Sequence, residues 1–401
     1  MKTTGEPDAA SLAARLADTL TSAEEIRDPA WRDAFRKVPR HVFIPDFATS
    51  EDTPDGTRYT LYTADGTDRP VWLDTAYTDQ TLVTQIDGKP VRDALPGGSG
   101  HGWATSSSTA PGLMAWMLHT LGVRDGDRVL EVGSGTGYNA ALLCERLGSE
   151  HVTTIDIDPQ LTGHARERLA RLGYLPTIAT TDGRDGFPGN APYDRIIATT
   201  SWPYLPAAWI TQATPGGTIL ANITGLLGGA MVLATVHDDG TATGRFLPRW
   251  AGFMVARPAI PRVADIDALD TEEGTYDTGT TRLDPALLQD AAFAFVAQLH
   301  TVDARPYWGT HEDGRDLFGL ISPDGSWAEI YPPDYAGRRH TEQGGPRRLW
   351  DLTEHAHRFW NDHDRPDWSH FGVTATSTTQ HAWFNAPDSA HAWPLPMPAT
   401  A

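Results

Sequence analysis

A glycine-rich turn between an apolar strand and a helix limits the possible folds of this chain more than any other feature. Residues Val129–Val132 form a short apolar run, which is typical of a buried strand. Gly133-Ser-Gly135-Thr-Gly137 follows, and Tyr138–Leu147 has helical spacing. Glycine has no Cβ atom, so a ligand can lie close to the backbone at such a turn. The pattern predicts a strand–turn–helix unit that binds a cofactor at the carboxyl edge of a sheet.

Further strands and helices alternate along the chain on both sides of this turn. The other predicted strands are Val152–Ile157, Thr177–Thr181, Arg195–Thr199, Thr218–Asn222 and Ala230–Val236, the last being a hairpin partner through Asp238–Gly240. The other predicted helices are Pro111–Leu121, Leu161–Leu172 and Ala207–Ala213. This alternation predicts an α/β fold with a doubly wound, mainly parallel, Rossmann-like sheet.

The regions on either side of this core have a different pattern. Helical spacing extends over Ser11–Val38, and residues 50–100 are expected to be loops with short strands at Val71–Asp74 and Thr81–Thr84. Beyond about residue 260 we expect a C-terminal α+β appendage. Its predicted elements are helices at Pro285–His300 and Arg348–Asp362 and hairpins pairing Leu317–Ile321 with Trp327–Tyr331 and Gly372–Thr376 with His381–Phe384. The predicted domains are a helical and loop region over the active site (1–107), a catalytic domain (108–258) and a substrate-recognition domain (259–401).

The cofactor class follows from details around the turn. A dinucleotide-binding turn would place its third glycine at position 138, which is Tyr138 here. Asp156 ends the second strand and can bind ribose hydroxyls in either class of protein. Asp182-Gly183 closes the third strand, where an acid can accept from an adenine amino group, and this favours S-adenosylmethionine. The alternative is that 133–137 is only a tight turn. The candidate cofactor-binding residues are Glu131, Gly133, Ser134, Gly135, Gly137, Tyr138, Asp156, Ile157, Asp182 and Gly183.

Composition narrows the possible partners. The net charge is -20, with 52 acidic residues against 32 Lys and Arg, so a nucleic-acid partner is disfavoured. Cys144 is the single cysteine, and the sequence has neither a signal-peptide pattern nor an apolar run long enough to cross a membrane. A cytoplasmic protein without a membrane partner is expected.

Two groups of side chains outside the turn have alternative interpretations. His355, His357 and His363, with His311–Asp313, do not have metal-ligand spacing, so no metal site is predicted. Tryptophans of the appendage either pack its core or bind a peptide; they are Trp308, Trp327, Trp350, Trp360, Trp368, Trp383 and Trp393.

Several motifs over residues 30 to 250 resemble, in the same order, those of the protein-L-isoaspartate O-methyltransferases. They are Phe35–Pro45, Tyr77–Leu82, Ser108–Pro111, Asp182–Arg184, Ala191–Asp194 and Pro215–Gly217. The resemblance implies methyl transfer from S-adenosylmethionine to a carboxylate, which is already anionic and needs no general base. It also implies that Thr109, helped by Ser108, holds the unreactive carboxylate oxygen. Asp79 either orders the loop over the cofactor or is a capping or turn aspartate.

Departures from the family point to a particular branch. The stretch from Leu82 to Ser106 is long, residues 106–109 are serine-rich, and the appendage is large. The chain is therefore similar to actinobacterial members that serve ribosomal-peptide gene clusters beside ATP-grasp or lanthipeptide enzymes. That branch implies an aspartyl or isoaspartyl acceptor in a modified precursor peptide, whose methyl ester can collapse to aspartimide. The alternatives are repair of isoaspartyl-containing proteins and a non-catalytic peptide-binding relative.

Overall fold

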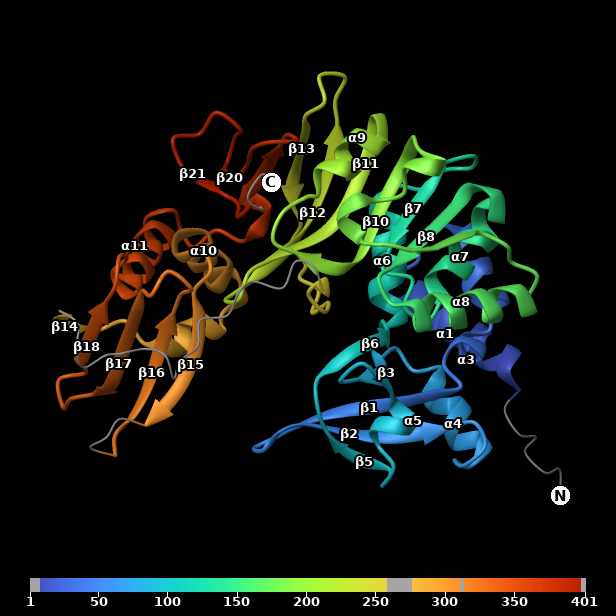
Figure 1. Cartoon of the computed structure of the whole chain (residues 1–401), viewed down its shortest axis with the longest axis horizontal. Coiled ribbons are helices and arrows are strands. Elements are labelled where there is room, and N and C mark those ends of the chain that lie inside the picture. Colours follow the sequence, from blue (N-terminus) through green and yellow to red (C-terminus); the bar gives the residue numbers. More distant parts are fainter. Residues whose placement is uncertain (1–7, 258–275, 311–313, 398–401) are drawn as a thin grey trace. The chain divides into compact units, whose positions relative to one another are not determined.

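The computed structural model describes residues 8–257, 276–310 and 314–397. The chain forms two compact units. The first consists of Met1–Thr200 and Thr211–Leu220, and the second of Ser201–Ile210 and Ala221–Ala401. Figure 1 shows their helices and strands in sequence colours.

A parallel sheet forms the centre of the first unit. Its strands are β7 (Val129–Val132), β8 (Val152–Asp156), β9 (Thr177–Thr180) and β10 (Tyr193–Trp202), in the order β10-β7-β8-β9, with β11 (Ala213–Thr224) beyond β10. The pairs β10–β7, β7–β8 and β8–β9 are all parallel. The accompanying helices are α6 (Pro111–Leu121), α7 (Tyr138–Leu147) and α8 (Pro159–Arg171). The helix α9 (Ala207–Gln212) follows β10, and its first four residues belong to the second unit. The predicted alternation of strands and helices is confirmed here.

Local sequence signals explain where these helices begin and end. Pro111 lies in the first turn of α6, and Gly122, with φ of 69°, ends that helix in the left-handed conformation. Asp158 caps α8 by accepting hydrogen bonds from the backbone N–H groups of Gln160 and Leu161. The predicted boundaries of both helices are therefore confirmed to within two residues.

A second sheet in the first unit replaces the predicted loops. Its strands are β1 (Asp46–Thr53), β2 (Gly56–Thr63), β3 (Leu82–Ile86), β4 (Lys89–Pro90), β5 (Ser99–His101) and β6 (Ala104–Ser108). The order is β4-β3-β1-β2-β5, and β6 pairs with β3 (Figure 1). Its buried core is Ala48, Tyr59, Val83, Ile86, Val91 and Leu95. The strand predicted at Thr81–Thr84 is confirmed as part of β3. The prediction of loops was wrong for β1 and β2, because pairing over the whole of these two strands overrides the low β-propensity of their Asp, Gly and Ser residues.

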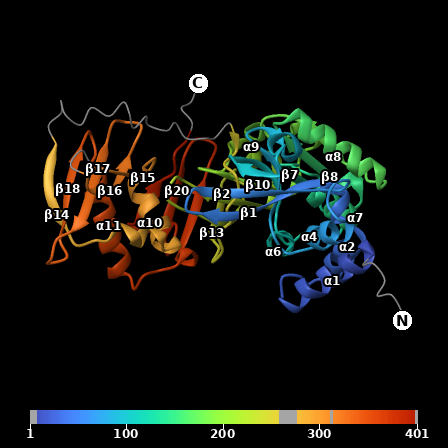
Figure 2. The same cartoon turned by 90° about the horizontal axis from the view of Figure 1, so that it is seen from below.

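The N-terminal helices also differ from the prediction. The single helical pattern forms α1 (Ala9–Ser22) and α2 (Pro29–Lys37), because Asp28 caps α2 and Pro29 starts it. The predicted strand at Val71–Asp74 is wrong, since these residues lie in α4 (Arg69–Ala76), which starts with a proline in its first turn. The short helices are α3 (Arg40–Phe43) and α5 (Val91–Ala94). Figure 2 shows α1, α2 and α4 grouped together.

The sheet that contains β7 to β11 has ten strands within the described residues, and five of them form an antiparallel region that belongs to the second unit. Its strands are β12 (Gly229–Val236), β13 (Ala242–Phe246), β19 (Phe371–Ala375), β20 (Gln380–Phe384) and β21 (Ala392–Pro394), in the order β21-β20-β19-β13-β12. Every pair from β12 to β21 is antiparallel. The prediction of a mainly parallel sheet was therefore wrong, and the sheet is mixed. The physical reason is that the C-terminal hairpin β19–β20 pairs with β13 instead of staying within a separate appendage.

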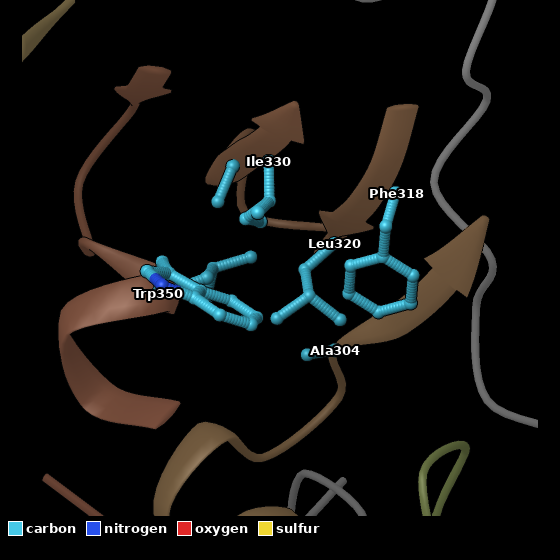
Figure 3. Packing of buried hydrophobic residues seen from close by; sticks show 7 residues of the cluster. Ala304, Phe318, Leu320, Ile330 and Trp350 are labelled. Carbon is cyan, nitrogen blue, oxygen red and sulfur yellow. The ribbon is translucent and has the colours of Figure 1, made fainter. Parts of the chain in front are cut away.

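A five-stranded antiparallel sheet and two helices complete the second unit. The strands are β14 (Asp277–Thr281), β15 (Arg305–Thr310), β16 (Asp316–Ile321), β17 (Trp327–Pro333) and β18 (Arg339–Gly344), and the helices are α10 (Ala291–Thr301) and α11 (Leu349–Asp362). Both predicted hairpins are confirmed. The helix predicted at Pro285–His300 is interrupted, because Asp290 ends a 3₁₀ turn and caps α10. Figure 3 shows Trp350 of α11 packed against Leu320 and Phe318 of the sheet.

Burial resolves most of the tryptophan question in favour of packing. Trp327, Trp350, Trp360 and Trp383 are buried, whereas Trp308 is 74% exposed. Over the described ranges, no three or more His, Cys, Asp or Glu residues are grouped to hold a metal ion, and residues 311–313 lie outside these ranges. Within the same ranges, no helix combines the length and apolar character needed to cross a membrane.

Candidate active site

Three loops lie side by side where neighbouring parallel strands end. The register pairs Val132 with Ile155, and the backbone N–H of Thr181 donates to the carbonyl oxygen of Asp156 at 3.0 Å. Because β7, β8 and β9 are parallel, their carboxyl ends lie at one edge of the sheet. This arrangement brings together the predicted glycine turn, Asp156-Ile157 and Asp182-Gly183.

The glycine turn is held close to the sheet by backbone hydrogen bonds. The N–H groups of Gly133 and Ser134 both donate to the carbonyl of Ile155, at 2.8 and 3.0 Å. Gly133, Gly135 and Gly137 all have positive φ values, of 104°, 49° and 87°. A Cβ on Gly133 would lie 2.5 Å from Oγ1 of Thr199, which in turn donates to the Gly133 carbonyl. Both conformation and space therefore require glycine at position 133.

Polar groups for a ribose and a purine follow the next two strands. Oδ2 of Asp156 accepts from the Gly135 N–H at 3.0 Å, and its Oδ1 accepts from the Asp158 N–H at 3.1 Å. Ile157, beside it, is 39% exposed. Asp182 accepts from both the backbone and the guanidinium of Arg184. Although partial burial raises the pKa of Asp182, the hydrogen bonds from Arg184 outweigh it and lower that pKa below its usual value.

Two of the candidate residues lie beneath the turn, away from this edge. Glu131 is completely buried and accepts from Asn139 at 2.7 Å and from Thr154 at 2.6 Å. Burial raises the pKa of Glu131 to about 7 despite these two hydrogen bonds. Ser134 shares a hydrogen bond with Thr154, also in the interior. The structure places both side chains where they support the turn.

Tyr138 begins α7, and its ring lies in the aromatic core formed with the N-terminal helices. Its ring centroid is 6.3 Å from that of Phe35 and 5.8 Å from that of Phe43. The Tyr138 ring therefore packs against α2 and α3. The candidates that follow β8 and β9 lie at the sheet edge instead.

The residues at this edge fit S-adenosylmethionine. Outside residues 134–136, no atom of the described residues lies closer than 3.7 Å to the position of a Cβ on Gly135, so the backbone there can be approached closely. A carboxylate at Asp156, an exposed aliphatic side chain at Ile157 and an acid at Asp182 complete the edge. Asp156 would hold ribose hydroxyls and Asp182 an adenine amino group, while Ile157 would contact the purine.

The six-stranded sheet covers the other side of the turn. The carbonyl oxygen of Ser107 on β6 is the atom 3.7 Å from the Gly135 Cβ position. The buried side chain of Gln85 on β3 donates to Oδ2 of Asp158 at 3.1 Å, next to Asp156. The sequence analysis missed Gln85 because the strand that it predicted at Thr81–Thr84 stops one residue short of it, and no motif indicated the strands at residues 89–108.

The three predicted acceptor-side residues lie at the end of β6. Thr109 directly follows the strand and is half-buried, and over the described ranges its hydroxyl makes no hydrogen bond. Ser108 is buried, and its hydroxyl accepts from Nε of Arg40 at 3.4 Å. Asp79 accepts from the N–H of Gly112 in the first turn of α6, at 2.7 Å. This contact is the kind that a capping aspartate makes, and the other predicted role of Asp79, ordering the loop over the cofactor, stays a prediction.

Arg40 is a residue of this site that the sequence analysis missed. Its guanidinium is fully buried and donates to carbonyl oxygens on both sides of the acceptor region. A charged residue between Pro39 and the apolar Val42–Ile44 was an available signal, because a cation in a buried run needs specific partners.

Known proteins resemble this chain over the regions just described. The family model for Protein-L-isoaspartate(D-aspartate) O-methyltransferase (PCMT) matches residues 66–243. A protein-L-isoaspartate O-methyltransferase of Ignicoccus hospitalis is 43% identical over 196 residues, which are 48% of this chain and 72% of that protein. One of Methylorubrum extorquens is 33% identical over 217 residues, which are 54% of this chain and 76% of that protein.

A solved structure of the same name shares the fold. Its TM-score is 0.53 at 20% sequence identity, and the match covers 93% of this chain and 100% of that one. This match shows that the two chains share a fold over most of their length. The match at 43% identity covers 72% of the Ignicoccus protein, and the family model matches residues 66–243 of this chain. Both findings indicate the same family. The chain belongs to the protein-L-isoaspartate O-methyltransferase family of S-adenosylmethionine-dependent carboxyl methyltransferases.

Proposed function

We propose that this protein methylates the side-chain carboxylate of an aspartyl or isoaspartyl residue in a ribosomally made, modified precursor peptide. The observation that carries the acceptor assignment is the hydroxyl of Thr109. It lies at the end of β6, the strand that passes over Gly135, and it makes no hydrogen bond within the described residues. A hydroxyl in this position can donate to one carboxylate oxygen without neutralising the other.

The chain's own residues would act by alignment and by exclusion of water. S-adenosylmethionine, when bound, supplies a methyl group on a sulfonium. Asp156 and the glycine turn would fix the cofactor, and Thr109 would fix the acceptor carboxylate opposite it. Holding two reactants in line is worth roughly 7–11 kcal/mol in favourable cases. No proton-transferring residue is needed, because the carboxylate that attacks the methyl group is already an anion.

The product ester has a further reaction open to it. Methoxide leaves from an ester more readily than an oxide leaves from a carboxylate, so the following backbone nitrogen can close an aspartimide ring. The ring is the proposed product in a tailoring role and a precursor of normal aspartate in repair.

Two features support a modified precursor peptide as the methyl acceptor. The six-stranded sheet brings a long segment, residues 46–108, to the acceptor side. In the second unit Trp308 on β15 is largely exposed, and we propose that residues 259–401 recognise the peptide. Trp308→Ala should then raise KM for a precursor several-fold and leave KM for a short isoaspartyl peptide unchanged. Tyr335→Ala, at another exposed aromatic residue of this unit, is the matched control.

Repair of isoaspartyl proteins is the second candidate function. It is favoured by the names of the relatives and by the solved structure that covers most of this chain. A non-catalytic, peptide-binding role is the third.

One experiment separates all three functions. The purified full chain is incubated with S-adenosylmethionine and either an isoaspartyl peptide or a modified precursor peptide, and methyl transfer is followed by mass spectrometry. Methylation of the precursor supports the proposal, and methylation of the isoaspartyl peptide alone rejects it in favour of repair. Absence of cofactor binding in calorimetry rejects both enzymatic functions.

A further inference from the structure

Arg40 is a buried cation on the acceptor side of the site, and all three nitrogen atoms of its guanidinium donate hydrogen bonds. It is 0% exposed and begins α3. Nη1 donates to the carbonyls of Ala76 and Thr78 at 3.1 and 2.7 Å. Nη2 donates to the carbonyl of Gln80 at 2.9 Å. The guanidinium thus holds three carbonyl groups of the segment 76–80.

The same guanidinium also binds the segment that carries the acceptor hydroxyl. Nη2 donates to the carbonyls of Ser108 and Thr109, both at 3.3 Å, and Nε donates to the Ser108 hydroxyl at 3.4 Å. An arginine has five N–H donors in a fixed planar arrangement, and here they reach six acceptors on two segments. The position of Thr109 relative to segment 76–80 therefore depends on one side chain.

Burial of a cation in this position is costly unless geometry compensates for it. The contacts just given are all with neutral oxygen atoms, and burial lowers the pKa of Arg40 to about 10, which still leaves it charged at neutral pH. Satisfied donors offset the cost of desolvation, and a group with fewer donors would leave carbonyls unpaired.

Asp79 joins the same two segments a second time. It lies within segment 76–80, and its carboxylate accepts from the N–H of Gly112. A Cβ on Gly112 would lie 2.6 Å from Oδ2 of Asp79, so glycine is required for this approach. Arg40 and Asp79 therefore fix the backbone on both sides of Thr109, at residues 108–109 and at residue 112.

We propose that Arg40 is a positioning residue for methyl transfer, which acts by holding the backbone of Thr109 against segment 76–80. The proposal rests on the proposed role of Thr109. Displacement of a positioned group by about 1 Å can slow a reaction by roughly 100-fold. A substitution at Arg40 should therefore reduce kcat through Thr109 and leave the cofactor edge intact.

The test is a double-mutant cycle on the full chain with S-adenosylmethionine and whichever acceptor the wild type methylates, the modified precursor or an isoaspartyl peptide. Arg40→Lys keeps the charge but gathers its donors on one nitrogen, so kcat should fall by roughly 10- to 100-fold. The Kd for S-adenosylmethionine should stay within about twofold. In a Thr109→Ala background the same substitution should change kcat by less than about threefold, because the hydroxyl that it positions is gone.

Arg195→Lys is the matched control. Arg195 is also a mostly buried arginine that donates to carbonyls, those of Gly122 and Asp194, but it lies near the amino end of β10. Its substitution should leave kcat within about threefold of the wild-type value. Arg40→Gln is measured in the same way if Arg40→Lys is not obtained as folded protein.

Hydrogen exchange keeps this proposal separate from the proposed function. In Arg40→Lys, peptides covering 76–80 and 108–112 should exchange faster together, while the glycine turn at 133–137 should be unchanged. Additive effects of Arg40→Lys and Thr109→Ala on kcat, or equal loss of cofactor affinity, would overturn the positioning role. If the wild-type chain methylates no acceptor, the proposed function fails, and unchanged exchange in both segments rejects the role of Arg40.

Discussion

The cofactor side and the acceptor side of this site are assembled in different ways. On the cofactor side, each polar group follows a strand of one parallel sheet, so the order along the chain predicts the position in space. On the acceptor side, Arg40, segment 76–80 and Thr109 come from three segments without periodic relation, and one guanidinium connects them. The cofactor side therefore depends on many backbone contacts and the acceptor side on a few side chains.

Asp156→Ala should have the largest effect and should be confined to the cofactor side. The substitution removes a carboxylate that holds Gly135 and that would accept from two ribose hydroxyls. Hydrogen bonds to a charged group are worth about 1.5–3 kcal/mol each, so the Kd for S-adenosylmethionine should rise by about 100-fold or more in calorimetry.

Asp182→Ala is the comparison variant on the same edge. The Kd for S-adenosylmethionine should rise less, by roughly 3- to 10-fold. Only the hydrogen bond from one adenine amino group is lost, and the carboxylate of Asp182 already accepts hydrogen bonds from Arg184. A weaker effect of Asp156→Ala than of Asp182→Ala would reverse the assignment of the two acids.

Glu131→Gln tests the support beneath the turn through the pH dependence of stability. The folded-state pKa of Glu131 is raised from 4.5 to about 7 by burial. A raised pKa means that its contribution to stability is fully present below pH 4.5 and is lost as the pH rises through 7. A shift of this size corresponds to on the order of 3 kcal/mol.

Glutamine cannot ionise, so Glu131→Gln should gain stability relative to the wild type as the pH rises from 4.5 to 7. Urea unfolding of both proteins across that range measures the difference. A difference that does not change with pH would show that Glu131 keeps an ordinary pKa. Asn139→Ala, which removes a donor to Glu131, should retain the pH dependence.

Thr109→Ala should affect the acceptor side alone. Loss of a hydroxyl that donates to a carboxylate is worth about 1.5–3 kcal/mol, so kcat should fall by roughly 10- to 100-fold with the Kd for S-adenosylmethionine unchanged. Thr109→Ser keeps the hydroxyl and should recover most of the activity. Equal loss of cofactor affinity in Thr109→Ala and Asp156→Ala would remove the distinction between the two sides.

The difference between the two sides also explains what could be predicted from the sequence. The strands, the glycine turn, Asp156 and Asp182 were predictable because period and turn chemistry are local. The partners of Arg40 were not, because they are 36 to 69 residues away and are backbone carbonyls, which every residue has. Pairing of β13 with β19 was likewise not visible, since a hairpin pattern does not show which sheet it joins.

Ser108→Ala should have the smallest effect, although Ser108 is adjacent to Thr109. Its hydroxyl is buried and accepts one long hydrogen bond, of 3.4 Å, from Arg40, whose other contacts are with backbone carbonyls that the substitution leaves in place. A single weak hydrogen bond is worth about 0.5–1.5 kcal/mol, so kcat should change by less than about 10-fold and the Kd for S-adenosylmethionine not at all. A loss of kcat as large as that of Thr109→Ala would mean that Ser108 donates to the acceptor itself. Because the side chain is 3% exposed, that result would require the end of β6 to move when the peptide binds.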